Sequence, residues 1–338
     1  MKRSIVFAVP HFTPLIDVAR RAEAEGFDRL WTTENPGRDG LVRALTIGLA
    51  TERIGVASGI AYVFTRTPLS MAATAADIYE ATGGRFSLGL GAGTQGMRSR
   101  WYGITEFDHA ASRLEEYVHF LREVWASPQS FAFDGRFYRG NYSELDGERP
   151  RVPVWGSGIN ETMLRIAARS CDGVAVHPLG AHETYLDQVV IPAINAGVKT
   201  SGRPVEHAQW RVTAIDDDSG VARDRARRAL AFYFSTPSYA APADVSGWGE
   251  IARQVREAYR DKGPQWDSIS SLVPDEMVSE FCFAGTPDEV VAQFDLVSKA
   301  YSERGVTEIV LQAAASGTGE ETLANLDAIV ATLGLKRI

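Results

Sequence analysis

Short runs of β-branched and aromatic residues alternate with stretches of helical periodicity along almost the whole chain. Helical spacing of apolar residues follows each of the runs, as expected for strands joined by helical crossovers. Eight repeats predict a (β/α)8 TIM barrel as one domain over residues 1–338, with an open doubly wound sheet as the alternative. The predicted strands span residues 4–9, 27–33, 54–60, 86–90, 152–156, 173–176, 210–215 and 308–311.

Two segments interrupt this rhythm. The stretch 130–139 surrounds the dipeptide Asp134-Gly135 and predicts a β-hairpin. The region near 235–280 is rich in Ser, Pro, Gly and aromatic residues, and we expect an insertion or lid there.

Composition narrows the class of ligand. The chain has a net charge of -8 and no run of Lys or Arg, which disfavours nucleic acid and anionic membranes. Its longest nearly uncharged run, 54–64, is shorter than the ~20 residues of a membrane span. Two cysteines and no apolar leader after Lys2 and Arg3 suit a reducing cytoplasm. We therefore expect a cytoplasmic protein with a small-molecule substrate.

In a barrel of this kind the active site lies at the C-terminal ends of the strands. Most segments in that position carry small residues and few charges, which favours a planar organic cofactor over a metal cage. The residues directly after the predicted strands are His11, Glu34, Asn35, 61–66, 91–95, 157–160, His177 and Gln312.

Glycines mark two of these turns and one further segment. The segment GLGAGT (89–94) would let backbone N–H groups approach a ligand, or would form only a tight turn. The segment GSGIN (156–160) opens a helix and could bind a phosphate, or could merely cap that helix through Ser157 or Asn160. The segment AGTPDE (284–289) fits helix initiation alone, with Pro287 in the first turn.

Two titratable side chains stand at strand ends. His177 precedes Pro178 and could exchange a proton near neutral pH, or could make a structural hydrogen bond. Glu34 follows a buried strand and requires a partner. Arg66 could bind an anion or cap the barrel rim. The other histidines, at 109, 119, 182 and 207, are expected on the surface.

Several catalytic signatures are missing from the sequence. It contains no G-x-S-x-G, H-E-x-x-H, P-loop or C-x-x-C motif. Serine hydrolase, zinc protease and NTPase activities are therefore disfavoured.

A set of short segments resembles the bacterial luciferase-like superfamily of flavin- and deazaflavin-dependent oxidoreductases, in the same order along the chain. They are RAEAEGFD (21–28), LWTTE (30–34), ATERI (50–54), GGRF (83–86), LGLG (88–91), FDGRFY (133–138), DGV (172–174) and GTPDEV (285–290). Further segments resemble a subgroup that uses coenzyme F420, an 8-hydroxy-5-deazaflavin. They are HP (177–178), Tyr185, PA (192–193), AFY (231–233), STPSY (235–239) and GWG (247–249).

The resemblance implies where a cofactor would lie. It implies a non-proline cis peptide within 59–64, placed at Tyr62–Val63, and a ring held in the barrel mouth. Residues implied to support the ring are Ala61, Tyr62 and Val63. Those implied to lie beside the ring or its ribityl chain are Gly91, Ala92, Gly93, Thr94 and Gln95. Those implied to hold the phosphate are Ser157, Gly158, Ile159 and Asn160.

The resemblance further implies hydride transfer between the deazaflavin and a small organic substrate. His177 is our first candidate for the proton and Glu34 the second, with a substrate pocket formed by His11, Asn35, Tyr233 and Tyr239. Well-known F420-dependent dehydrogenases have a His in place of Asn35 and a Glu near Gly96, so their proton relay is not transferred here.

Three further expectations accompany this assignment. An FMN-dependent monooxygenase of the same fold, using reduced flavin and O2, is the first alternative. A non-catalytic ligand-binding barrel is the second. We also expect a homo-oligomer, in the simplest case a dimer.

Overall fold

The computed structural model describes residues 1–7, 11–127, 129–143, 149–314 and 319–334. The chain divides into two compact units. Unit 1 comprises Met1–Asp28, Val176–Pro192 and His207–Ile338, and unit 2 comprises Arg29–Ala175 and Ala193–Glu206.

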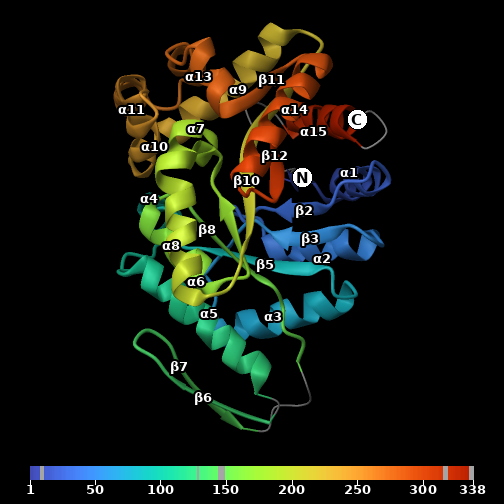
Figure 1. The fold of residues 1–338 in the computed structure, drawn as a ribbon, viewed down its shortest axis with the longest axis vertical. Coiled ribbons are helices and arrows are strands. Elements are labelled where there is room, and N and C mark those ends of the chain that lie inside the picture. The colour runs from blue at the N-terminus through green and yellow to red at the C-terminus, as the bar shows by residue number, and fades with distance from the viewer. Residues whose placement is uncertain (8–10, 128, 144–148, 315–318, 335–338) are drawn as a thin grey trace. The chain divides into compact units, whose positions relative to one another are not determined.

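Unit 2 is built on a sheet whose strands follow one another in chain order (Figure 1). The strands are β2 (Arg29–Thr32), β3 (Gly55–Ser58), β5 (Phe86–Gly91), β8 (Val154–Gly158) and β9 (Gly173–Val176). The pairs β2–β3, β3–β5 and β5–β8 are parallel. The helices of this unit include α2 (Gly40–Ala50), α3 (Pro68–Ala81), α4 (Gln95–Trp101), α5 (Ala110–Ala126) and α6 (Glu161–Ser170).

Local sequence signals fix where these helices begin. The Asp39 carboxylate accepts from the N–H groups of Leu41 and Val42 and caps α2. Thr67 caps α3 through its hydroxyl, with Pro68 in the first turn. Both caps stand at the end of a loop that leaves a strand, so they also hold those loops in place.

The chain bends sharply after β3. The peptide bond Gly59–Ile60 is cis, and the short strand β4 (Ala61–Tyr62) then pairs with β5. The cis bond lies within the predicted segment, but its placement at Tyr62–Val63 was wrong. At Gly89 a Cβ atom would lie 1.9 Å from the carbonyl oxygen of Ser58, so only glycine permits this close approach.

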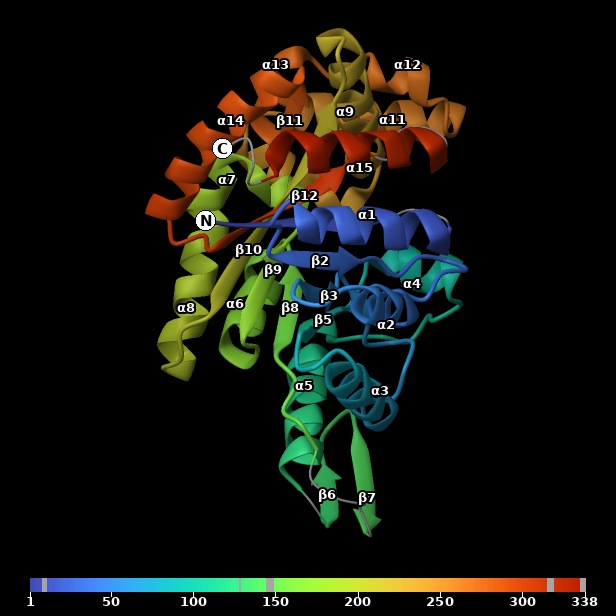
Figure 2. The same cartoon turned by 90° about the vertical axis from the view of Figure 1, so that its right-hand side faces the viewer.

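The predicted hairpin is present as β6 (Ser130–Asp134) and β7 (Arg139–Ser143), an antiparallel pair. Phe131 and Phe133 pack on Phe120 of α5, and Figure 2 shows the hairpin at the end of that helix. The aromatic contacts explain why the hairpin is ordered although only two strands form it.

The parallel strands of unit 1 pair in the order β11–β10–β12–β1 and belong to the same ten-stranded sheet. Its strands are β1 (Lys2–Phe7), β10 (Glu206–Ile215), β11 (Cys282–Gly285) and β12 (Glu308–Ala313). Its long helices are α1 (Phe12–Ala24), α9 (Ser219–Phe234), α14 (Pro287–Glu303) and α15 (Gly319–Leu333). Thr286 and Glu289 form a capping box at the start of α14, within the segment where the sequence predicted helix initiation.

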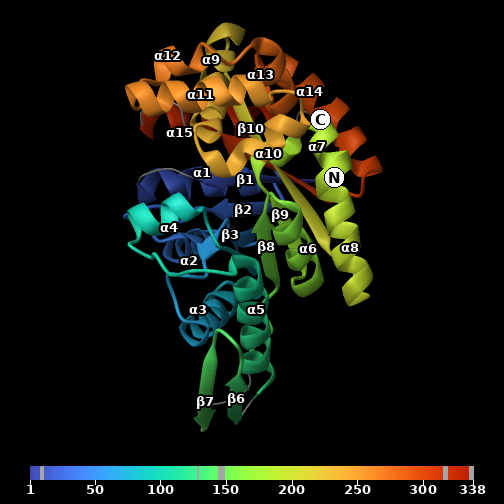
Figure 3. The same ribbon diagram turned by 90° about the vertical axis from the view of Figure 1, so that its left-hand side faces the viewer.

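After β9 the chain continues through η1 (Pro178–Ala181), α7 (Glu183–Tyr185), η2 (Leu186–Val190) and α8 (Ile191–Ser201). The predicted insertion is mostly helical and gathers beside α9 (Figure 3). It contains η3 (Pro237–Tyr239), α10 (Ala240–Val245), α11 (Gly249–Lys262), α12 (Trp266–Ser270) and α13 (Asp275–Phe281).

Every predicted strand has a counterpart, namely β1, β2, β3, β5, β8, β9, β10 and β12, and a helix follows each one. Residues 8 and 9 of the first predicted strand lie outside the described residues. The alternation is that of a (β/α)8 barrel. The assignment of residues 1–338 to one domain remains a prediction. No helix of the described residues is both long enough and apolar enough to cross a membrane.

Two histidines expected on the surface are buried. His182 Nε2 lies 2.9 Å from Glu280 Oε2, and the same oxygen accepts from the indole of Trp248. His207 lies in β10, and its side chain is buried there. The expectation failed because burial of a polar ring depends on tertiary neighbours, which a single sequence position does not reveal.

Burial of His207 predicts acid sensitivity. Desolvation lowers its pKa from 6.5 to about 4, so below pH 6.5 the unfolded chain binds a proton that the folded chain does not. Stability should therefore fall as the pH drops from 6.5 to 4, with about 3 kcal/mol contributed by this group. Urea titrations across that range should show a shallower pH slope for His207→Gln; an unchanged slope would contradict the prediction.

Candidate functional site

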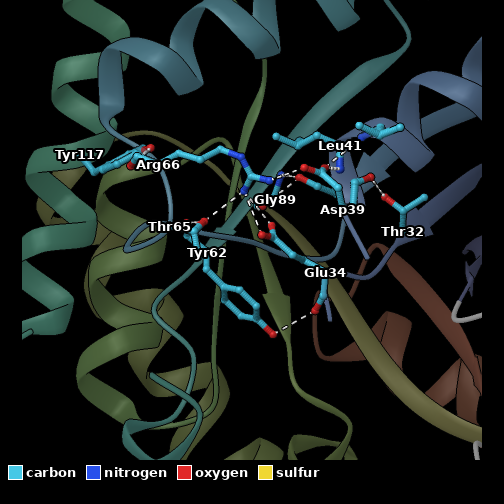
Figure 4. Close-up of polar contacts among 12 residues, drawn as sticks. Thr32, Glu34, Asp39, Leu41, Tyr62, Thr65, Arg66, Gly89 and Tyr117 are labelled. Atoms are coloured by element: carbon cyan, nitrogen blue, oxygen red, sulfur yellow. Dashed lines mark hydrogen bonds and ion pairs between the residues drawn. The ribbon is translucent and has the colours of Figure 1, made fainter. Parts of the chain in front are cut away.

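An ion-pair network occupies the C-terminal end of β2 and the loop after β4 in unit 2 (Figure 4). Arg66 Nη1 donates to both carboxylate oxygens of Glu34 at 3.0 Å. Arg66 Nη2 donates to Asp39 Oδ2 at 2.6 Å. Glu34 therefore has the charged partner that a buried carboxylate requires, and this partner is Arg66.

Burial and charge oppose each other at Glu34, whose side chain is only 6% exposed. Desolvation raises its pKa, and Arg66 acts in the opposite direction without cancelling the rise. Desolvation also acts to raise the pKa of Asp39, but the Val42 N–H and Arg66 outweigh it and lower that pKa. Asp39 is therefore an anion with a lowered pKa. Glu34 has a raised pKa, and Arg66 favours its charged form.

Tyr62 joins this network to the bend after β3. Its hydroxyl donates to the backbone carbonyl of Glu34 at 3.2 Å, and its ring stacks on Phe64 with 5.1 Å between centroids. Ala61 and Val63 are buried on either side of it, and Val63 N donates to the Gly91 carbonyl. Ala61, Tyr62 and Val63 thus form a hydrogen-bonded backbone segment along the end of β5, called the shelf below.

The segment Gly91–Gln95 runs from the last residue of β5 to the first residue of α4, a short helix that the sequence did not predict. Gly93 has φ of +58°, a left-handed conformation that disfavours most side chains. Arg98 Nη1 donates to the carbonyls of Ala92 and Gly93, both at 2.9 Å. Thr94 caps α4 through Met97 N, so the loop is fixed at both ends.

The segment from Ser157 to Asn160 lies where β8 passes into α6. Ser157 and Gly158 still belong to the strand, and Asn160 is the residue that caps the helix, accepting from Met163 N at 2.9 Å. The first N–H groups of α6 have no partner within their own helix, as at every helix start. Ser157 and Gly158 are half-buried, and Ile159 and Asn160 continue the same turn.

His177 lies in unit 1 at the C-terminal end of β9. Its Nδ1 accepts from the Leu179 backbone N–H at 3.2 Å. Its ring stacks on Tyr239 at 4.4 Å between centroids and lies edge-to-face with Tyr233 at 4.8 Å. Desolvation lowers its pKa to about 3, which contradicts the expectation that the ring titrates near neutral pH.

The four predicted pocket residues behave differently. Tyr233 and Tyr239 contact His177, and the Tyr233 hydroxyl accepts from the Gln312 amide. Asn35 donates through its amide to the Thr33 hydroxyl at 3.1 Å. His11 is exposed at the N-cap position of α1 and makes no capping hydrogen bond there.

The structure therefore brings the predicted residues together in two groups. Unit 2 joins Glu34 and Tyr62 to Arg66, and unit 1 joins His177 to Tyr233 and Tyr239. Sequence reasoning missed Asp39 as the second carboxylate on Arg66. Its position before the helix that starts at Gly40 marks a cap, but no sequence signal gives the contact with Arg66.

Comparisons with known proteins give the family and the fold of the chain. Residues 3–332 match the family model described as luciferase-like monooxygenase. The 5,10-methylenetetrahydromethanopterin reductase of Archaeoglobus fulgidus is 29% identical, with 86% of each chain covered.

Two solved structures resemble the fold. One is the coenzyme F420 dependent tetrahydromethanopterin reductase from Methanopyrus kandleri, with a TM-score of 0.82, 20% identity and 98% and 97% of the two chains covered. The other is the oxygenating constituent of 3,6-diketocamphane monooxygenase from Pseudomonas putida in complex with FMN, with a TM-score of 0.68, 16% identity and 100% and 99% coverage.

These likenesses extend over nearly the whole chain and confirm the fold class. The architecture is a (β/α)8 TIM barrel of the luciferase-like type. The chain belongs to the luciferase-like monooxygenase family.

Proposed function

We propose that the protein is a coenzyme F420-dependent oxidoreductase that transfers a hydride between the deazaflavin and a small organic substrate. The observation that carries this proposal is the shelf of unit 2 together with the Gly91–Gln95 segment beside it. Its backbone is held by the hydrogen bond from Val63 N to the Gly91 carbonyl and by those from Arg98 to the Ala92 and Gly93 carbonyls, and a preformed site for a planar ring requires such fixed backbone. A relative from Mycobacterium tuberculosis named as a putative coenzyme F420-dependent oxidoreductase, 25% identical over 88% of this chain, supports F420 as the cofactor.

The residues of unit 2 fit such a group. Ala61, Tyr62 and Val63 would support the ring, and the segment Gly91–Gln95 would lie along its edge. A Cβ at Gly91 would lie 2.0 Å from Ile60 Cδ1, so the glycine brings the backbone close to its neighbours there. The start of α6, from Ser157 to Asn160, would take the phosphate through backbone N–H groups.

A bound deazaflavin supplies a carbon that accepts or gives up a hydride. The protein then has to orient the substrate, exclude water and control protons. In unit 1 we assign substrate contacts to His177, Tyr233 and Tyr239. His11 and, in unit 2, Asn35 stay sequence-based candidates for substrate contacts. Glu34, locked to Arg66, positions the shelf through the hydrogen bond from Tyr62 to its carbonyl.

The cofactor loop gives a specific test. Gly93→Val places a β-branched residue at φ of +58°, with its Cβ 3.2 Å from Met97 Sδ, and should weaken F420 binding at least tenfold. Gly103→Val is the matched control, because Gly103 has φ of +68° and open space around its Cβ. Fluorescence titration with F420 measures both; equal losses in the two variants would contradict the loop assignment.

We infer that two copies of the chain associate through α2 and α3. Val42 and Leu49 on α2 are 51% and 64% exposed, and Leu69 on α3 is 38% exposed. These helices pack on each other within unit 2, so the three exposed apolar side chains lie on neighbouring helices.

Charge at these side chains should separate the copies. The pair Val42→Glu and Leu49→Glu is expected to convert a dimer into a monomer, because a buried unpaired charge is costly. The control Leu296→Glu changes a 73% exposed residue on α14 and should leave the mass unchanged. Light scattering after size exclusion measures both. A monomeric wild type, or a double variant that stays dimeric, would exclude this interface.

The thiols support a cytoplasmic location. Cys171 and Cys282 are both buried and free, and burial raises the pKa of each to about 12. Neither is part of a disulfide, as in proteins of reducing compartments. We therefore assign the protein to the cytoplasm.

A further inference from the structure

The His177 imidazole is anchored through one nitrogen only. Its Nδ1 faces the Leu179 backbone N–H at 3.2 Å. Because a backbone N–H can only donate, Nδ1 must be the unprotonated, accepting nitrogen. The neutral ring therefore carries its proton on Nε2.

The other nitrogen has no such anchor. In the described part of the chain, no hydrogen bond to Nε2 is found, and His177 is half-buried at the end of β9. A second proton would have to enter at Nδ1, opposite the Leu179 N–H, and burial disfavours the charge as well. His177 is thus a fixed, uncharged hydrogen-bond donor.

The surroundings of the ring are also uncharged. Tyr239 of η3 and Tyr233 of α9 are the titratable side chains that contact it among the described residues. Burial raises the pKa of both phenols, so they keep their protons at neutral pH. The Tyr233 hydroxyl accepts from the Gln312 amide, which leaves its own proton available to another acceptor.

We propose that the reacting group of the substrate is an uncharged carbonyl, whose oxygen accepts the Nε2–H of His177. This inference rests on the proposed function for its hydride donor. A neutral imidazole donor polarises a carbonyl and stabilises the oxyanion that develops as the carbon is reduced. An alcohol would instead need a base, and Nε2 cannot act as one because it already carries a proton.

The reaction balances as follows. A hydride from the reduced deazaflavin, with its electron pair, forms a C–H bond at the carbonyl carbon, and the C=O π pair moves to oxygen. Water gives a proton to complete the hydroxyl group, and the hydroxide that remains takes up the ring N–H proton that the deazaflavin loses as it becomes oxidised. His177 keeps its proton throughout, since loss of Nε2–H would leave an imidazolate. Alcohol oxidation, the reverse, would start from the alkoxide and should rise about tenfold per pH unit while alcohol predominates.

The tautomer can be measured without any cofactor. Long-range ¹H–¹⁵N spectra of histidine-labelled protein, with His177→Phe used for assignment, should show an unprotonated Nδ1 and a protonated Nε2. This pattern should persist from pH 8 to pH 5. A proton on Nδ1, or a charged ring at pH 6, would overturn the proposal whether or not F420 binds.

Carbonyl recognition is tested with two molecules of the same shape. Acetophenone and α-methylstyrene differ only in an oxygen acceptor against a methylene group, and are titrated into F420-loaded protein. Acetophenone should bind about tenfold more tightly to the wild type and to His177→Gln, whose amide can donate from a similar position. The two should bind equally to His177→Phe. Equal affinities in the wild type, or no acetophenone binding, would contradict the proposal.

A wrong proposed function and a wrong carbonyl assignment would give different experimental results. If F420 does not bind, the fluorescence titration shows it before either probe is added, and the proposed function fails. If F420 binds but the probes are not distinguished, the proposed function stands and the carbonyl assignment fails.

Discussion

His177→Phe is expected to lower kcat for ketone reduction by ~10²–10³-fold, the loss usual when one donor to a developing oxyanion is removed. Phenylalanine keeps a planar ring for the stack on Tyr239, which lies 4.4 Å away between centroids. The substitution removes the Nε2–H and the acceptor for Leu179 N–H, and leaves the shelf residues of unit 2 unchanged. F420 affinity should therefore be preserved.

Steady-state kinetics with reduced F420 and a ketone that the wild type reduces measure this effect. His177→Gln should recover a large part of kcat, since its amide can donate. The wild-type kcat for reduction should not show a His177 titration between pH 5 and pH 8, because the pKa of this ring is about 3. Unchanged turnover in His177→Phe would contradict the proposed donor role and indicate that His177 has a structural role only.

The second large effect is expected from Arg66→Met. Arg66 is the cation for the buried Glu34 and for Asp39, and its loss leaves Glu34 without a charged partner. Removing one member of a buried pair costs about 3 kcal/mol of unfolding free energy. Loss of Arg66 also removes the influence that lowers the Glu34 pKa, so that pKa should rise further.

The sign of the pH dependence follows from that rise. With a folded pKa above the unfolded value of 4.5, the folded state binds the proton more tightly than the unfolded state does. The variant should be closest to wild type at low pH and lose stability as the pH rises above 4.5. Urea denaturation at pH 5 and pH 8 tests this. The double variant Glu34→Gln with Arg66→Met should be less sensitive to pH, and an equal deficit at both pH values in Arg66→Met would contradict the mechanism.

The sequence predicted the elements whose signals are local. Thr286, Pro287 and Glu289 lie within one helix turn, so these three residues are enough to place the start of α14. The hairpin at Asp134-Gly135 is equally local. The ends of the eight predicted strands were located to within a few residues, because hydrophobic periodicity changes there, whereas β4 and β11 were not predicted.

Features that depend on distant partners could not be predicted in this way. Glu34 required a cation, but only the fold brings it within 3.0 Å of Arg66 and adds Asp39 on the other side. The anchoring of His177 through Nδ1 depends on the turn after Pro178, and its stack depends on Tyr239 in the insertion. These tertiary contacts convert an expected proton carrier into an uncharged donor.

The identity of the cofactor as a deazaflavin is tested most directly by one measurement. Purified protein is titrated with coenzyme F420 and with FMN at the same salt concentration, and binding is followed by fluorescence quenching. We predict that F420 binds at least tenfold more tightly than FMN, and that turnover consumes no O2. Tighter binding of FMN, together with substrate-dependent O2 uptake, would contradict the deazaflavin assignment and identify a flavin monooxygenase of the same fold.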